Sequence, residues 1–285
     1  MFSISGFLIS ASYENTVNIE DFFKKRARRI LPGYYVNALV ILGMILTLVL
    51  PDVNVKDIVK WGITQVVCLG QTPGTLKNFA TGSLNGGLWS IIVELQLYVV
   101  TVFIYNWVKK SKLNSLLTII IFATFNLLYA YLPMPYSIKQ ILSRSFFPFG
   151  LWYMIGMVMY IYRDKLIPKI KEYVWAIFCS FIVYRVVILH FNIGVAGYYS
   201  DIITSFMLPI LSVSMAFVTK PIRFKQDFSY GIYLYHWCVL NLLVHFKMFD
   251  NLSGFTNLVI FVFGSLVFAS VSWFCVEKKF VRRKA

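Results

Sequence analysis

LWSIIVELQLYVVTVFIYNWV, residues 88–108, is a run of 21 residues with a single charged side chain, Glu94. The hydrocarbon core of a bilayer is about 30 Å thick, and a helix needs roughly 20 mostly apolar residues to cross it. Transmembrane β-strands are about ten residues long and alternate apolar with polar side chains, which this run does not do. The stretch therefore predicts a transmembrane helix in an all-α membrane protein.

Seven further apolar stretches have a comparable length, so with residues 87–108 the chain is predicted to form eight full transmembrane helices. These stretches are residues 33–50, 113–132, 145–162, 173–191, 201–218, 228–246 and 256–276. Two apolar segments are shorter: residues 1–12 predict a partial helix, and residues 58–70 predict an interfacial or re-entrant segment. Because no repeat, low-complexity tract or polar appendage interrupts the chain, we expect one membrane domain over residues 1–285.

The composition of the whole chain supports this class. Of the 285 residues, 59% are hydrophobic and 14% are charged, whereas about a quarter of a soluble domain is charged. Too few charged side chains remain to cover a water-facing surface, which excludes a cytosolic globular enzyme, a disordered chain and a disulfide-rich secreted scaffold. A net charge of +15 would suggest nucleic acid for a soluble protein, but in a membrane protein basic loops set the orientation. The four widely spaced cysteines predict free thiols and no metal site.

The basic residues test this map of spans. If residues 13–32 are cytoplasmic and the loops alternate from there, twenty of the 27 Lys and Arg residues fall in cytoplasmic segments and six in external ones. This bias follows the positive-inside rule and places the C-terminus in the cytoplasm. The same map makes residues 1–12 run inward from the outer face, so we expect that the chain begins inside a membrane helix and lacks an earlier one.

Glu94 is one of three ionisable residues that stand out within the predicted spans. Such residues cost roughly 2.5–3.5 kcal/mol each on insertion scales, so they indicate function or pairing. Helical spacing places Glu94 on one face with other polar side chains: Ser90, Tyr98, Thr101 and Tyr105. This polar stripe either forms a hydrogen-bonded seam between helices or lines a cavity, and the carboxylate favours the cavity.

The other two ionisable residues are His236 and Arg185. His236 shares one face of the 228–246 stretch with Ser229 and Tyr233. A neutral imidazole there can accept a proton, donate one or anchor a hydrogen bond, although a lone buried histidine is also commonly structural. Arg185 can extend to the outer interface, pair with a carboxylate or bind an anion.

The densest positive charge lies in FFKKRARRILPGYY, residues 22–35. Arg26 and Arg29 are three residues apart, so they share a face if the segment is helical. Pro32 and Gly33 predict the junction with the next span. The five basic residues either anchor the topology or form an anion site at the cytoplasmic mouth, where arginine can bind phosphate in a bidentate manner.

Several separated motifs together resemble the acyltransferase 3 family of integral membrane O-acyltransferases. In the family's order they are SGFLIS (5–10), RARRILPGYY (26–35), LWSIIVELQLYVV (88–100), RSFFPFGLWYMIGM (144–157), SYGIYLYHW (229–237) and SWFCVEKKF (272–280). The resemblance covers nearly the whole chain, with Lys279 standing where the family usually has proline.

The resemblance implies a multi-pass plasma-membrane enzyme that takes an acyl group, often acetyl, from acyl-CoA at the inner face. The acceptor would be a hydroxyl of a cell-surface polysaccharide or related glycan, and the partners would be membrane lipids, not nucleic acid. By resemblance, Arg26 and Arg29 would hold the phosphates of coenzyme A. Glu94 would lie in the catalytic chamber, which His236 and Tyr233 would help to shape, and no metal would be needed.

One feature of the family has no counterpart here. The family's first helix carries an Arg and, about ten residues later, a His treated as the catalytic base, and neither can be assigned in this sequence. His236 belongs to a different motif and does not replace that His. Two other hypotheses therefore stay open. The chain is a transporter or flippase for glycan intermediates, whose path a polar stripe would line equally well, or it is a non-catalytic fragment that another chain completes.

Overall fold

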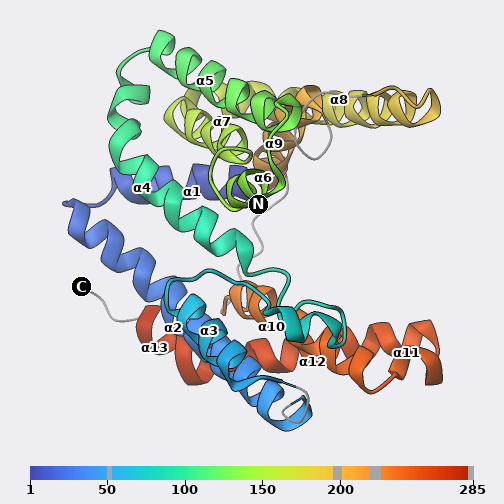
Figure 1. Cartoon of the computed structure of the whole chain (residues 1–285). Coiled ribbons are helices and arrows are strands. Elements are labelled where there is room, and N and C mark those ends of the chain that lie inside the picture. Colours follow the sequence, from blue (N-terminus) through green and yellow to red (C-terminus); the bar gives the residue numbers. More distant parts are fainter. Residues whose placement is uncertain (50–52, 195–200, 219–225, 282–285) are drawn as a thin grey trace. The chain divides into compact units, whose positions relative to one another are not determined.

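The computed structural model describes residues 1–49, 53–194, 201–218 and 226–281. Every regular element in these ranges is helical, which confirms the all-α class (Figure 1). Five helical stretches in them are long and apolar enough to cross a membrane: α2 (Ile19–Leu48), α4 (Trp89–Lys110), α5 (Lys112–Tyr131), α8 (Arg163–His190) and Gly254–Val281. The last consists of α12 (Gly254–Ser272), a π-helical turn (Trp273–Glu277) and α13 (Lys278–Val281).

Three predicted spans form shorter helices, namely α7 (Gly150–Ile161), α9 (Ile202–Val218) and α10 (Ser229–His245). α7 begins later than the prediction of residues 145–162 because Pro148 disfavours helical backbone at the residue before it. Each of the eight predicted ranges thus contains a helix, but in the described residues only five helical stretches are long enough, and apolar enough, to cross a membrane. Residue 50 of the first range, and the basic residues within 219–225 and 282–285, lie outside the described residues.

The remaining elements are short: α1 (Phe2–Glu14), α3 (Val55–Val66), the 3-10 turn η2 (Gly74–Asn78), α6 (Tyr136–Leu142) and α11 (Met248–Asn251). α1 and α3 correspond to the two short segments that the apolar pattern predicts.

α2 is one continuous helix through Pro32, so the junction predicted at Pro32 and Gly33 is wrong. Proline removes one N–H from a helix, and the turns that follow it are fixed by buried hydrogen bonds. The hydroxyl of Tyr34 donates to Gln65 Oε1 at 2.8 Å, and the side chain of Asn37 donates to the Leu234 carbonyl oxygen at 3.0 Å. These contacts offset the lost bond and extend the helix back over the basic segment.

The chain divides into two compact units. Unit 1 comprises Met1–Phe22 and Val93–Arg223, and unit 2 comprises Phe23–Ile92 and Phe224–Ala285. α2 and α4 therefore both begin in one unit and continue in the other.

Unit 1 is built around close contact between α1 and α7. A Cβ atom on Gly6 would lie 2.1 Å from the Tyr153 carbonyl oxygen, and one on Gly156 would lie 1.9 Å from the Ser3 carbonyl oxygen. Small residues let two helix backbones approach in this way, which is common packing for membrane helices. Both glycines lie in motifs that carry the family resemblance.

Unit 2 is organised by α10, which packs against α2 and α12. A Cβ atom on Gly33 would lie 2.8 Å from the Tyr230 ring, and one on Gly231 would lie 2.8 Å from the backbone of Ala269. The hydroxyl of Tyr230 donates to the Ile30 carbonyl oxygen at 2.8 Å. These contacts fix the first turns of α10 beside the half of α2 that carries the arginines.

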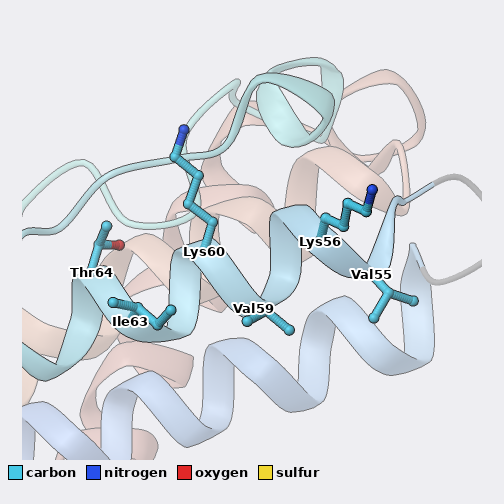
Figure 2. A pocket seen from close by; sticks show the side chains of 6 residues that line it. All are labelled: Val55, Lys56, Val59, Lys60, Ile63 and Thr64. Atoms are coloured by element: carbon cyan, nitrogen blue, oxygen red, sulfur yellow. The ribbon is translucent and has the colours of Figure 1, made fainter.

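α3 runs back along α2, as expected of a re-entrant segment. It begins after the end of α2, and its last turn is hydrogen-bonded to the middle of α2, where Tyr35 donates to the Val66 carbonyl oxygen at 3.0 Å. Apolar and basic side chains of α3 line a shallow hollow of about 360 Å³ (Figure 2). The short segment predicted at residues 58–70 is therefore helical over residues 58–66.

Candidate functional site

The arginine pair lies on the first half of α2. Arg26 is half-buried and Arg29 is exposed, and because the segment is helical the two share a face, as predicted. The guanidinium of Arg29 donates to Asp227 Oδ2 at 2.9 Å, with about half of each side chain exposed. Asp227 stands just before α10, so this ion pair ties the basic segment to the start of that helix.

Asp227 is fixed by a second set of bonds. Its Oδ1 accepts hydrogen bonds from the backbone N–H and the hydroxyl of Ser229, at 3.2 and 2.5 Å. Partial burial favours the neutral acid, but the bonds from Ser229 and the charge of Arg29 outweigh it and lower the pKa of Asp227. The carboxylate therefore stays ionised and competes with any anion that approaches Arg29.

Tyr233 and His236 lie on α10, one and two turns after Ser229. The hydroxyl of Tyr233 donates to the Gly87 carbonyl oxygen and accepts from Ser90 Oγ at 2.8 Å. His236 Nδ1 lies 3.0 Å from the Ile232 carbonyl oxygen. A carbonyl only accepts, so Nδ1 carries a proton in this geometry, and in the neutral imidazole the lone pair is then on Nε2.

The loop before α4 is held against α10 by buried amide side chains. Asn85 donates to the Leu234 carbonyl oxygen at 2.8 Å and to Asn37 Oδ1 at 3.2 Å, and it accepts from the Gly87 N–H at 3.1 Å. Asn37 is 0% exposed and Asn85 is 5% exposed. This network fixes the Gly87 backbone beside Tyr233.

Asn241 fixes the same loop further along α10. It is fully buried, accepts from the hydroxyl of Thr81 at 2.7 Å, and donates to the carbonyl oxygens of Ser83 and Leu84 at 2.9 and 3.0 Å. Irregular backbone at membrane depth persists only when its polar groups are paired, and Asn241 supplies these partners. The sequence reasoning missed the asparagines, although Asn37 and Asn241 stand out as amides inside apolar spans.

Glu94 belongs to unit 1, unlike the other candidate residues. Its Oε1 accepts hydrogen bonds from the hydroxyls of Ser5 and Tyr98, at 2.9 and 2.7 Å. Further along the stripe, Thr101 is hydrogen-bonded to the hydroxyl of Tyr153 at 2.6 Å. From Glu94 onward the stripe on α4 therefore forms an interhelical hydrogen-bonded seam within unit 1, whereas Ser90 belongs to unit 2.

The site residues thus fall into two groups. Arg26, Arg29, Tyr233 and His236 all belong to unit 2, where the packing of α2 on α10 brings the arginine pair to the start of the helix that bears the other two. Glu94 forms its contacts in unit 1, and each group is described within its own unit.

A second carboxylate in unit 1 gathers several partners. Glu14, at the end of α1, accepts from Lys109 Nζ at 2.5 Å and from the Tyr160 hydroxyl at 2.6 Å, and the Arg163 guanidinium lies 3.5 Å away. The bond from Lys109, then that from Tyr160, lowers the pKa of Glu14 to about 2. This cluster of charged and hydroxyl side chains joins the ends of α1, α4 and α7. In the sequence, the one indication of it is an isolated acidic residue near basic loops.

Arg185 is paired with a carboxylate, one of the three alternatives that the sequence left open. Its guanidinium lies 3.4 Å from Asp201 Oδ2, and Asp201 also accepts from the backbone N–H and the hydroxyl of Thr204. The four cysteines are free thiols.

The fold and these buried polar groups define an integral membrane protein with a hydrogen-bonded polar interior. Residues 1–277 match the family model of the acyltransferase domain, Acyl_transf_3. The chain therefore belongs to the acyltransferase 3 family, which confirms the resemblance carried by its motifs.

Two curated proteins are similar over most of their length. An "O-acetyl transferase" of Shigella phage Sf6 is 25% identical over 297 residues, which covers 100% of this chain and 84% of the relative. "Nodulation protein 10" of Rhizobium leguminosarum bv. viciae is 24% identical over 309 residues, covering 97% of this chain and 79% of the relative. No solved structure matches the chain.

Proposed function

We propose that this protein is a plasma-membrane O-acyltransferase that moves an acyl group, acetyl in the simplest case, from acyl-CoA to a hydroxyl of a cell-surface polysaccharide or related glycan. Family membership and the relative named as an O-acetyl transferase support the reaction class. The observation that carries the donor assignment is the arrangement of unit 2. The start of α10 lies beside the arginine pair of α2, and the same helix carries Tyr233 and His236.

The distances along α10 suit a donor of this shape. Arg29 is bonded to Asp227 just before Ser229, and Tyr233 and His236 follow Ser229 by four and seven residues. At 1.5 Å per residue these side chains lie about 6 and about 10 Å further along the helix. Coenzyme A carries phosphates at one end and a thiol at the end of a flexible arm, so phosphates at Arg26 and Arg29 would direct the thioester toward Tyr233 and His236.

Because a thioester is already activated, the protein needs only to position the donor beside the acceptor hydroxyl and to provide a proton acceptor. The acceptor hydroxyl oxygen attacks the thioester carbonyl carbon, the carbon–sulfur bond breaks, and the hydroxyl proton ends on the sulfur of free coenzyme A. His236 presents the Nε2 lone pair to which such a hydroxyl can donate a hydrogen bond. Hydrogen-bond donors around the attacked carbonyl would stabilise the developing oxyanion, and Glu94 is proposed as a further catalytic residue, supplied by unit 1.

Purified protein in nanodiscs, supplied with acetyl-CoA and a cell-envelope glycan extract, tests this function. We expect release of free thiol that depends on the extract, together with acetyl ester on the glycan. Movement of the glycan across the bilayer without thiol release would replace the proposal with the transporter hypothesis.

A further inference from the structure

α3 carries an exposed surface that the proposed reaction does not use. Val55, Val59 and Ile63 are 68%, 56% and 64% exposed, and their spacing of four residues places them in one row along the helix (Figure 2). Exposure of three branched apolar side chains in one row is unfavourable in water and favourable against hydrocarbon. In a membrane protein this row is therefore a surface for lipid chains.

Two lysines accompany the apolar row. Lys56 and Lys60 are exposed and lie one turn apart on α3 (Figure 2). Within the described ranges, neither ammonium group forms an ion pair with a carboxylate, and the neighbouring Asp57 instead accepts from the Thr75 hydroxyl at 2.7 Å. With Thr64, the apolar row and both lysines line the hollow of about 360 Å³.

This combination selects the chemistry of the ligand. A free nucleotide or a glycan would use the ammonium groups but leave the apolar row uncovered. A neutral lipid would cover the row but leave two positive charges unpaired at the edge of the hydrocarbon. A lipid with an anionic head satisfies both, because its chain covers the row while its phosphate accepts from the lysines.

The position of the hollow separates it from the arginine pair. The last turn of α3 is bonded to Tyr34 and Tyr35 in the middle of α2. Lys56, in the first turn of α3, therefore lies toward the end of α2, whereas Arg29 lies on the other side of Tyr34. The arginine pair and the lysine pair of unit 2 therefore lie toward opposite ends of α2. The predicted topology assigns the lysines to the outer leaflet.

We propose that the groove of α3 formed by Val55, Lys56, Val59, Lys60 and Ile63 is a binding site for one anionic phospholipid. The lipid chain lies along the valine and isoleucine side chains, and the phosphate is held between the two ammonium groups.

Native mass spectrometry of the protein released from nanodiscs tests this proposal, with phosphatidylglycerol and phosphatidylcholine supplied in equal amounts. We expect retained phosphatidylglycerol to exceed phosphatidylcholine, and the double variant Lys56→Gln/Lys60→Gln to lose that preference by about 25-fold, since each lysine near an anionic lipid surface contributes roughly fivefold. Glutamine is one atom shorter than lysine and has a similar helix propensity, so α3 should remain helical.

Lys77→Gln, which removes one basic charge from the same predicted external segment outside the groove, is the matched control and should retain the preference. Val59→Asp tests the apolar half, and it should lower retention of both lipids at the site. Equal retention of the two lipids by the wild type, or an equal loss in the control and the double variant, would overturn the proposal. Because no thioester is present, this outcome is independent of the acyltransferase assay.

Discussion

The two compact units bury polar groups in different ways. In unit 1 the helices are regular, and α1 and α7 touch through the backbones at Gly6 and Gly156, with carboxylates bonded at helix ends and in one seam. In unit 2 an irregular loop lies against α10, and Asn85 and Asn241 bond its backbone groups. Unit 1 also has an irregular segment, where Gln96 and Asn126 bond the backbone of residues 144–148. The difference is that the loop of unit 2 brings non-helical backbone to the candidate donor site, as functional loops on rigid scaffolds commonly do.

Gly156→Ala should have the largest effect, because it breaks the backbone contact on which unit 1 depends. The added Cβ would lie 1.9 Å from the Ser3 carbonyl oxygen, so the helices must separate, at a cost of about 3 kcal/mol. Thermal unfolding in detergent should show a fall of several degrees or a loss of folded protein. Gly43→Ala, where nothing lies within 4 Å of the added atom, should leave stability unchanged or slightly raised. Equal behaviour of the two variants would contradict the close-contact interpretation.

Asn241→Leu tests the corresponding support of unit 2. The leucine has a similar volume but leaves the Leu84 carbonyl oxygen without the amide that bonds it, whereas the Ser83 carbonyl oxygen keeps its bond from Trp237 Nε1. An unpaired buried group costs about 1–3 kcal/mol. We expect a lower unfolding temperature and faster proteolysis of residues 79–88. Asn251→Leu, at an exposed asparagine with one local bond, is the control, and protection of the loop in Asn241→Leu would disprove its role.

Arg26→Ala/Arg29→Ala should weaken binding of coenzyme A about thirtyfold, because charge-assisted hydrogen bonds to phosphate contribute about 1.5–3 kcal/mol. Isothermal titration of the purified protein measures this change. Lys25→Ala/Arg28→Ala removes the same charge from exposed positions of the same segment and should weaken binding much less. If both double variants bind coenzyme A equally well, the arginine pair is a topology anchor and not a phosphate site.

Asp227→Asn should strengthen binding of coenzyme A by about threefold. Its ion pair with Arg29 is half exposed, and such pairs contribute only about 0–1 kcal/mol, so removing repulsion of the incoming phosphates outweighs the lost orientation of Arg29. Asparagine can still accept both hydrogen bonds from Ser229 through its side-chain oxygen. Asp164→Asn, at a carboxylate with 89% of its side chain exposed, should change nothing. Weaker binding in Asp227→Asn would instead make Asp227 a residue that positions Arg29.

The smallest effect is expected at Glu14 in unit 1. Its pKa is lowered from 4.5 to about 2 in the folded protein, so the stability that it adds is present above pH 4.5 and is lost as the pH falls toward 2. Glu14→Gln should be slightly less stable than the wild type at pH 7, and the difference should shrink at pH 3. Glu172→Gln, at an exposed position, should match the wild type throughout. A constant difference at all pH values would contradict the electrostatic cause.

Much of the fold could be predicted from apolar run length alone, because a helix in a bilayer must pair its backbone within itself. The helical path of the arginine segment through Pro32 could not, since it depends on the contacts of Tyr34 and Asn37. The candidate site residues were selected by their motifs and their chemistry, and their roles stay predictions. The partners of these residues were not predicted, because Asp227 is 198 residues from Arg29 and no periodicity relates residues so far apart.

The π-helical turn at Trp273–Glu277 has a consequence for reading the closing motif. This turn sets Ser272 Oγ 2.7 Å from Glu277 Oε1, five residues later, although Glu277 is 3% exposed. In a regular α-helix, side chains four residues apart lie on the same face, whereas a π turn holds about one residue more than an α turn. The extra residue held in this turn therefore brings the side chain of Glu277 onto the same face as Ser272.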